Sequence, residues 1–156
     1  MRFKMKKIWF LVLAVCLIGF LAGCDDGSDS TPNISTYVLT DHAMISGITQ
    51  IDGGIHGILT TDGDEVEVLQ TITLNFSDNT FTLYYKMNNI TTSSIDLNVT
   101  FSGKMKLSGS TLALIADKQT DNDTSVETPV TPPEPYYYKV TPNTLADDLG
   151  AVYTKQ

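Results

Sequence analysis

Apolar and polar side chains alternate in the middle of the chain with the period of a β-strand. The apolar positions are Val66, Val68, Ile72, Leu74 and Phe76 in a first run and Phe81, Leu83, Tyr85 and Met87 in a second. The polar residues 77–80 stand between the runs, and Asp and Asn there suit a turn. Two alternating runs joined by so short a link predict an antiparallel hairpin. Leu69 interrupts the alternation and indicates a bulge or a bend near Gln70.

Shorter segments on both sides continue the strand pattern from Thr36 onward. Turn residues such as Asp52-Gly53-Gly54 and Ser108-Gly109-Ser110 separate them, and 143–149 favours a short turn. The further strands are expected at 44–51, 55–60, 95–101, 104–107, 111–115, 136–140 and 151–153. This pattern of roughly eight strands predicts an all-β, antiparallel up-and-down barrel, since closure removes exposed sheet edges. An open β-sandwich is the alternative.

The segment 117–135 departs from this pattern. It holds four of the six prolines of the chain and has a strong acidic bias. Because proline cannot donate to a central ladder, the sequence predicts a long Pro-rich, acidic loop between two strands. Loops of this length are usually functional or disordered.

The beginning of the chain has the organisation of an export signal. Four basic residues lie within the first seven positions, and an apolar run follows from Ile8 to Ala22. At about fifteen residues this run is shorter than the roughly twenty that a transmembrane helix needs. We therefore expect a signal peptide over 1–23, with an uncleaved membrane anchor as the alternative.

The end of this segment, Leu21-Ala22-Gly23-Cys24, resembles the lipobox of bacterial lipoproteins. The resemblance implies cleavage between Gly23 and Cys24, a diacylglyceryl group on the Cys24 thiol and often a palmitate on the new amino group. Two or three acyl chains suffice for stable anchoring, whereas one chain is marginal. Cys24 is therefore the predicted lipidation site, and the cell envelope the predicted location.

The residues after Cys24 predict the layout of the mature protein. Residues 24–35 are the lipidated Cys and a polar, flexible tether, and residues 36–156 form the barrel domain. An Asp at the position of Asp25 resembles the inner-membrane retention signal of enterobacterial lipoproteins. Asp25 thus favours the inner membrane where that rule applies, and otherwise the choice between inner and outer membrane stays open.

Charge and cysteine content narrow the range of partners. All 18 acidic residues but only six of the ten basic ones follow Cys24, which leaves a formal charge of −12 after the signal. This argues against nucleic acid, whose phosphates bind Lys and Arg, and against docking of the protein surface on anionic lipid. Besides Cys24, the only cysteine is Cys16 within the signal, so we expect no disulfide in the domain.

Several hairpins resemble those of small bacterial lipocalin-like lipoproteins. Residues 74–83, LNFSDNTFTL, are similar to their "F-x-D-G-T-F-T" hairpin. Residues 101–114, FSGKMKLSGSTLAL, resemble a "G-x-Y-x-x-x-G-x-x-L-x-L" step, and 138–145, YKVTPNTL, the closing "Y-x-V-x-G-x-T-L" hairpin. Asn79, Met105 and Pro142 depart from these patterns, and the Gly-x-Trp of true lipocalins is missing. The resemblance implies a barrel that holds a small apolar ligand.

Three groups of residues are candidate metal ligands by residue type. His42 beside Asp41 and Met44 suits a soft metal in residue type, but exposed loop residues are the simpler interpretation. Two acidic groups suggest calcium without the spacing of a calcium loop, so solvated loops are expected for both. The two groups are Asp62, Asp64, Glu65 and Glu67, and Asp117, Asp121, Asp123 and Glu127. We predict neither a metal nor another cofactor.

No catalytic site is predicted either. Ser and Thr are numerous, but none stands in a Gly-x-Ser-x-Gly elbow. The most unusual local feature is Tyr136-Tyr137-Tyr138. Alternation puts Tyr136 and Tyr138 on one face and Tyr137 on the other, where an aromatic lip suits contact with a ligand or partner. Structural packing beside the Pro-rich segment is the simpler interpretation of the three tyrosines.

Two functions follow from the predicted fold. The first is a membrane-anchored binding module whose barrel takes a small apolar molecule, since eight strands either fill a barrel or leave room for one ligand. A cavity well under about 300 Å³ would count against it. The second is a structural or interaction lipoprotein with a filled core that meets an envelope protein through its surface.

Overall fold

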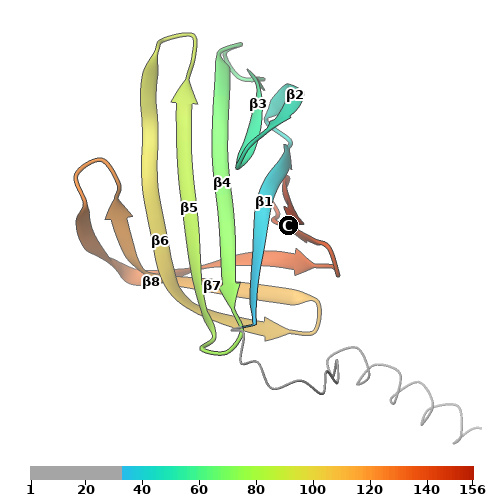
Figure 1. Cartoon of the computed structure of the whole chain (residues 1–156), viewed down its shortest axis with the longest axis vertical. Helices are drawn as coiled ribbons and strands as arrows, with labels where there is room; N and C mark the ends of the chain where they lie inside the picture. Colours follow the sequence, from blue (N-terminus) through green and yellow to red (C-terminus); the bar gives the residue numbers. More distant parts are fainter. Residues whose placement is uncertain (1–32) are drawn as a thin grey trace, which may run out of the picture. The chain divides into compact units, whose positions relative to one another are not determined.

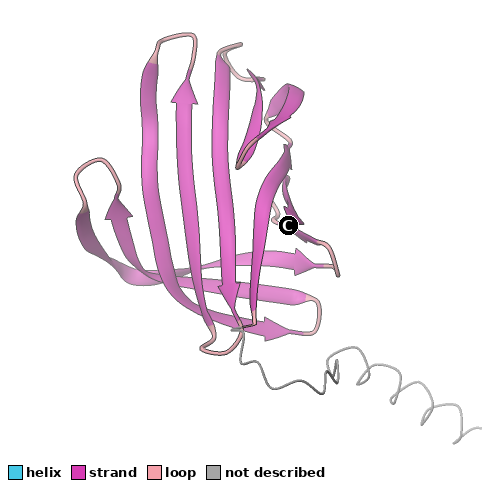
Figure 2. Cartoon of the chain, viewed as in Figure 1, coloured by secondary structure: helices cyan, strands magenta, loops and turns pink. Residues whose placement is uncertain are grey.

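The computed structural model describes residues 33–156, and Figure 2 shows only strands and loops there. The first five strands are β1 (Ile34–His42), β2 (Ile45–Ile51), β3 (Gly54–Leu59), β4 (Glu65–Asn75) and β5 (Thr80–Asn89). The other five are β6 (Ser94–Ser108), β7 (Thr111–Asp121), β8 (Val126–Val140), β9 (Thr144–Ala146) and β10 (Ala151–Lys155). No helix in this part is long and apolar enough to cross a membrane. Gly23, Cys24 and Asp25 lie outside the described residues.

Eight of the strands close into an antiparallel barrel (Figure 1). Their order is β1-β10-β9-β8-β7-β6-β5-β4, and β1 pairs a second time, with β4, through Ile34–Val38 against Thr71–Asn75. The β2–β3 hairpin lies outside this circle and extends the sheet from β4. The predicted all-β barrel is confirmed, it agrees with a lipocalin-like fold, and the alternative of an open sandwich is wrong.

Strand β4 shares one edge between two partners. Its first half, Glu65–Leu69, pairs with β3, and its second half, Thr71–Asn75, pairs with β1. At the junction the Gln70 N–H donates to the Gly53 carbonyl (3.1 Å). The bulge or bend expected near Gln70 is absent from the β4–β5 ladder, whose register runs without a shift from Val66 to Asn75. The interruption of the pattern therefore coincides with the exchange of strand partners.

Strand β6 is one long element where the sequence predicts two. It curves along its length (Figure 1), and its register with β7 shifts between Ser102 and Gly103. A side chain at Gly103 would overlap the Ile115 carbonyl oxygen of β7. The glycine thus permits the close backbone approach at the irregularity and keeps the strand continuous.

The predicted loop at 117–135 is wrong over most of its length. Strand β7 continues to Asp121 and β8 begins at Val126, so only 122–125 form the turn. The physical reason is that β8 borders β9 only through Lys139 and Val140 and otherwise has no second ladder partner among the described strands. Proline is tolerated on such an edge.

The hydrogen bonding of β8 shows how one proline fits. The Val140 N–H donates to the Ser110 carbonyl (2.8 Å), on the β7 side. Since N–H groups alternate in direction along a strand, the nitrogen of Pro135 faces the other edge. Its missing N–H therefore costs the β7–β8 ladder nothing. Four residues, 130–133, are inserted opposite Asp117, where the register between the two strands shifts.

Three boundaries differ from the sequence prediction. None of the strands predicted by residue range corresponds to β1. This strand begins at Ile34, inside the expected tether of 24–35. Ser35 is buried there. The turn expected at 143–149 instead contains the short strand β9. These elements are recognised as strands through their partners, since β9 has only three residues of its own.

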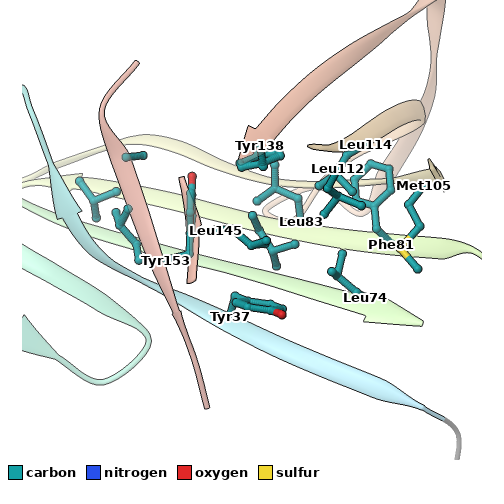
Figure 3. Packing of buried hydrophobic residues seen from close by; sticks show 14 of the residues in the cluster. Tyr37, Leu74, Phe81, Leu83, Met105, Leu112, Leu114, Tyr138, Leu145 and Tyr153 are labelled. Carbon is teal, nitrogen blue, oxygen red and sulfur yellow. The ribbon is translucent and has the colours of Figure 1, made fainter. Parts of the chain in front are cut away.

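A single cluster of buried apolar side chains packs inside the sheet (Figure 3). Leu112 and Leu114 come from β7, Leu39 from β1 and Leu145 from β9, and each is at most 1% exposed. Aromatic rings complete the packing, with the Tyr138 and Tyr153 rings edge to face at 5.8 Å between centroids. The buried members are Tyr37, Leu39, Ile45, Ile55, Val66, Val68, Ile72, Leu74, Phe81, Leu83, Met105, Leu112, Leu114, Ala116, Tyr138, Leu145, Ala151 and Tyr153.

Candidate functional site

The three consecutive tyrosines of β8 have three different environments. Tyr138 pairs with Leu112 inside the barrel, and burial raises the pKa of its hydroxyl. Tyr136 lies on the same face and is partly exposed, with its ring 6.4 Å from that of Phe101. Tyr137 faces outward and is 59% exposed. The alternation predicted from the sequence is confirmed, and it leaves Tyr137 as the tyrosine most accessible to a partner.

Tyr137 lies in a groove on the outer surface of β6, β7 and β8. The groove has a volume of about 480 Å³. Its lining residues are Lys106, Ser108, Thr111, Ala113, Ile115, Pro133, Pro135 and Tyr137. Among these described lining side chains there is no His, Asp or Glu.

The register of the three strands explains the shape of this groove. Lys106 of β6 pairs with Ala113 of β7, and Ala113 pairs in turn with Tyr137 of β8. The small methyl group of Ala113 thus lies between two long side chains and forms the floor. In the adjacent rows Ile115 pairs with Pro135 on one side of Ala113, and Thr111 with Lys139 on the other.

Three lysines give this face a positive local charge. Lys104 and Lys106 follow each other on the outer face of β6, and Lys139 lies on β8. All three are exposed. The two ion pairs among the described side chains are His56–Glu65 (2.9 Å) and Lys118–Glu127 (3.0 Å), and neither uses these lysines. Half of the six lysines that follow Cys24 therefore gather on this face, and none of the three forms an ion pair among the described side chains.

A second hollow lies at the β5–β6 turn. It has a volume of about 420 Å³. Its lining is Lys86, Asn88, Asn89, Ile90, Ser93, Ser94 and Ile95. The Asn88 Oδ1 atom is buried without a hydrogen-bond partner, while Asn88 Nδ2 donates to Glu67 (3.4 Å). This hollow is open to solvent, and no His or carboxylate is among its described lining residues.

The acidic candidates are used in local hydrogen bonds. Asp121 Oδ1 accepts the backbone N–H groups of Asp123 and Thr124, both at 3.0 Å, and the bond from Thr124 lowers the pKa of Asp121. Asp123 accepts from Asn98, and Glu127 pairs with Lys118. These contacts hold the β7–β8 turn in place, as Asx turns do.

The other acidic group is similarly divided. Asp62 accepts the Asp64 N–H (3.1 Å), and Asp64 accepts from Asn89 Nδ2 (2.7 Å). Glu65 pairs with His56.

His42 Nδ1 accepts the Met44 N–H (3.1 Å), and Asp41 accepts the His42 N–H (2.8 Å). Among residues 33–156 no three His, Cys, Asp or Glu side chains converge as metal ligands.

Tyr137 is a candidate contact residue from the sequence, whereas the groove around it is visible only in the structure. Lys106 and Ala113 belong to one hairpin, whereas Tyr137 is distant in the sequence, and the three side chains meet through the register of three strands. Comparison with protein families, with curated proteins and with solved structures finds no match for this chain. The candidate site is therefore argued from its own geometry.

Proposed function

We propose that this chain is a lipid-anchored lipoprotein of the bacterial cell envelope that binds a partner on the outside of a filled barrel. It acts without catalysis. The observation that carries the proposal is the cluster of buried apolar side chains, which pack against one another inside the barrel. Both hollows described above lie on the outside of the sheet.

The anchoring part of the proposal rests on the sequence before the barrel. The basic start, the apolar run and the lipobox ending at Cys24 stand in the order that lipoprotein signals require. The polar residues 25–33 then link the lipidated Cys to β1. The function is thus presentation of a barrel surface near a membrane, with Asp25 favouring the inner one.

The anchor is tested by replacing the lipidated residue. Cys24→Ser is expected to abolish labelling by an alkyne analogue of palmitate in a bacterial host and to reduce membrane association. Cys16→Ser lies within the signal and is the matched control, which should keep both. Undiminished labelling of the Cys24→Ser protein would contradict the proposed anchor.

The filled barrel is tested by native mass spectrometry of residues 25–156 purified gently from envelope extract. We expect the mass of the polypeptide alone, and no uptake from a lipid mixture, since the interior is packed. A reproducible, stoichiometric extra mass that disappears on denaturation would overturn the proposal and favour a carrier of a small apolar ligand.

A further inference from the structure

We propose that the groove over β7 binds an extended acidic segment of a partner protein. The inference deepens the proposed function and rests on it, since it names the surface and the chemistry of the partner. The groove is bounded by Lys106 on one side and by Tyr137 and Pro135 on the other, with Ala113 and Ile115 as its floor.

Charge complementarity selects an acidic occupant. Lys104, Lys106 and Lys139 lie on the face that contains the groove, although the chain as a whole is strongly acidic. Their exposed ammonium groups are available to carboxylates of a partner, and such charge-assisted hydrogen bonds are stronger than neutral ones. The negative charge of the rest of the molecule then restricts binding to partners that place their carboxylates on this face.

The shape of the groove selects a single extended chain. Ala113 lies below the level of Lys106 and Tyr137, so the floor is recessed between two walls. A flat bilayer surface cannot fill a recess of this kind, and the acidic domain would also be repelled by anionic lipid. The described strands of a second copy are paired within its own sheet, so none of them is a single extended chain that could enter the recess.

The prolines at the edge of β8 limit how the partner segment can bind. Pro133 and Pro135 line the groove, and the nitrogen of Pro135 faces the free edge without a hydrogen to donate. Addition of a partner strand to this edge would lose a ladder hydrogen bond there. The segment therefore lies across the outer face and is held by side chains, with apolar residues on Tyr137 and Ile115 and carboxylates at the lysines.

The test uses two capped peptides and residues 25–156, which keep every described strand. One peptide is Glu-Leu-Glu-Pro-Glu-Leu-Glu, and the other has Gln in place of every Glu. Amide chemical shifts are followed by NMR at low ionic strength, because surface charges are screened by salt. We expect the acidic peptide to shift signals in 104–108, 111–115 and 133–139, and the Gln peptide to shift them much less.

Two variants and a control assign the binding to the groove. Lys106→Gln and Tyr137→Ala are each expected to weaken binding by roughly threefold to tenfold, as expected for the loss of one contact. Lys155→Gln removes the same charge from β10, outside the groove, and should leave the affinity unchanged. Far-ultraviolet circular dichroism shows whether each variant is folded.

Several outcomes overturn the inference. They are equal binding of both peptides, shifts outside the groove, absence of binding to the acidic peptide, and binding only to phosphatidylglycerol vesicles. The peptide results are independent of the native mass spectrum. If the barrel carries no bound ligand and the groove does not bind the acidic peptide, the proposed function stands and only this inference fails. A ligand found inside the barrel removes the proposed function whatever the peptide does.

Discussion

Among the individual residues, tyrosines supply most of the aromatic rings of the buried core. The described part of the chain has no tryptophan, and Tyr37, Tyr138 and Tyr153 lie within the buried cluster. Burial raises the pKa of each of these hydroxyls, and it also raises that of the partly buried Tyr85. Their neutral forms are therefore favoured by the fold, and ionisation opposes it.

This environment predicts unfolding in alkali. In the unfolded chain these tyrosines ionise near their ordinary pKa of about 10, whereas the raised pKa values of the folded state keep them neutral. The stability is thus fully present below about pH 10 and is lost as the pH rises above that value. We expect tyrosinate absorbance and loss of circular dichroism to develop together.

Substitutions assign this effect to the buried rings. Tyr153→Phe removes one group whose ionisation favours the unfolded state, so the alkaline midpoint should move to higher pH. Tyr137→Phe changes an exposed tyrosine and should leave the midpoint unchanged. Titration of all seven tyrosines near their ordinary pKa, with the strand signal intact, would contradict the prediction.

At the scale of the element, β8 shows how a strand edge tolerates proline. Over Val126–Tyr138 it has β7 on one side and no second ladder partner among the described strands on the other. Exposed edges invite pairing with other chains, and prolines protect against it. The prolines of β8 are thus compatible with the fold. They also disfavour pairing of the free edge of β8 with a strand of another chain.

Replacing these prolines tests whether they are needed for folding or only limit association between molecules. Pro133→Thr together with Pro135→Thr should keep the barrel folded, because the β7–β8 ladder does not use the nitrogen of Pro135. The new N–H group at position 135, on the free edge, should promote association at high concentration, measured by sedimentation velocity.

Thr82→Pro is the comparison in a central strand, since β5 pairs on both sides. It should cost about 3 kcal/mol or more of unfolding free energy in urea titrations, by the cost of a proline that breaks regular hydrogen bonding. A double variant of β8 that is equally destabilised would show that the edge assignment is wrong.

At the scale of the whole molecule, β1 closes the barrel. It pairs with β10 on one edge and with β4 on the other, so the beginning and the end of the domain lie side by side. Tyr37 and Leu39 project from β1 into the core between these partners. The stability of the whole barrel therefore depends on the short C-terminal strand.

Deletion of residues 151–156 tests this dependence. The deletion removes Ala151 and Tyr153 from the core and leaves β1 with β4 alone, so we expect loss of cooperative unfolding in urea and of the near-ultraviolet tyrosine signal. Deletion of Gln156 alone is the control, since it removes one backbone bond to Thr36 (2.9 Å). Cooperative unfolding of the longer deletion, at nearly the original stability, would contradict the closure argument.

The amino-acid sequence alone predicts the strand class, the hairpin of β4 and β5 and the barrel as the way to bury one apolar face per strand. These features are local, because alternation and turn residues act within a few positions. It also placed Tyr136 and Tyr138 on the face opposite Tyr137, for the same reason.

Other features of the molecule depend on contacts between residues distant in the chain, and these features follow only from the three-dimensional fold. Strand β9 has three residues and is stabilised by its neighbours. The end of β7 and the first part of β8 lie within 117–135, where the sequence predicts a loop, because the effect of a proline on a strand depends on whether its edge is free. The groove of Lys106, Ala113 and Tyr137 arises from the register of three strands. Alternation within each strand restricts that register to steps of two residues, and the turn geometry and the packing between strands select the pairing that is observed.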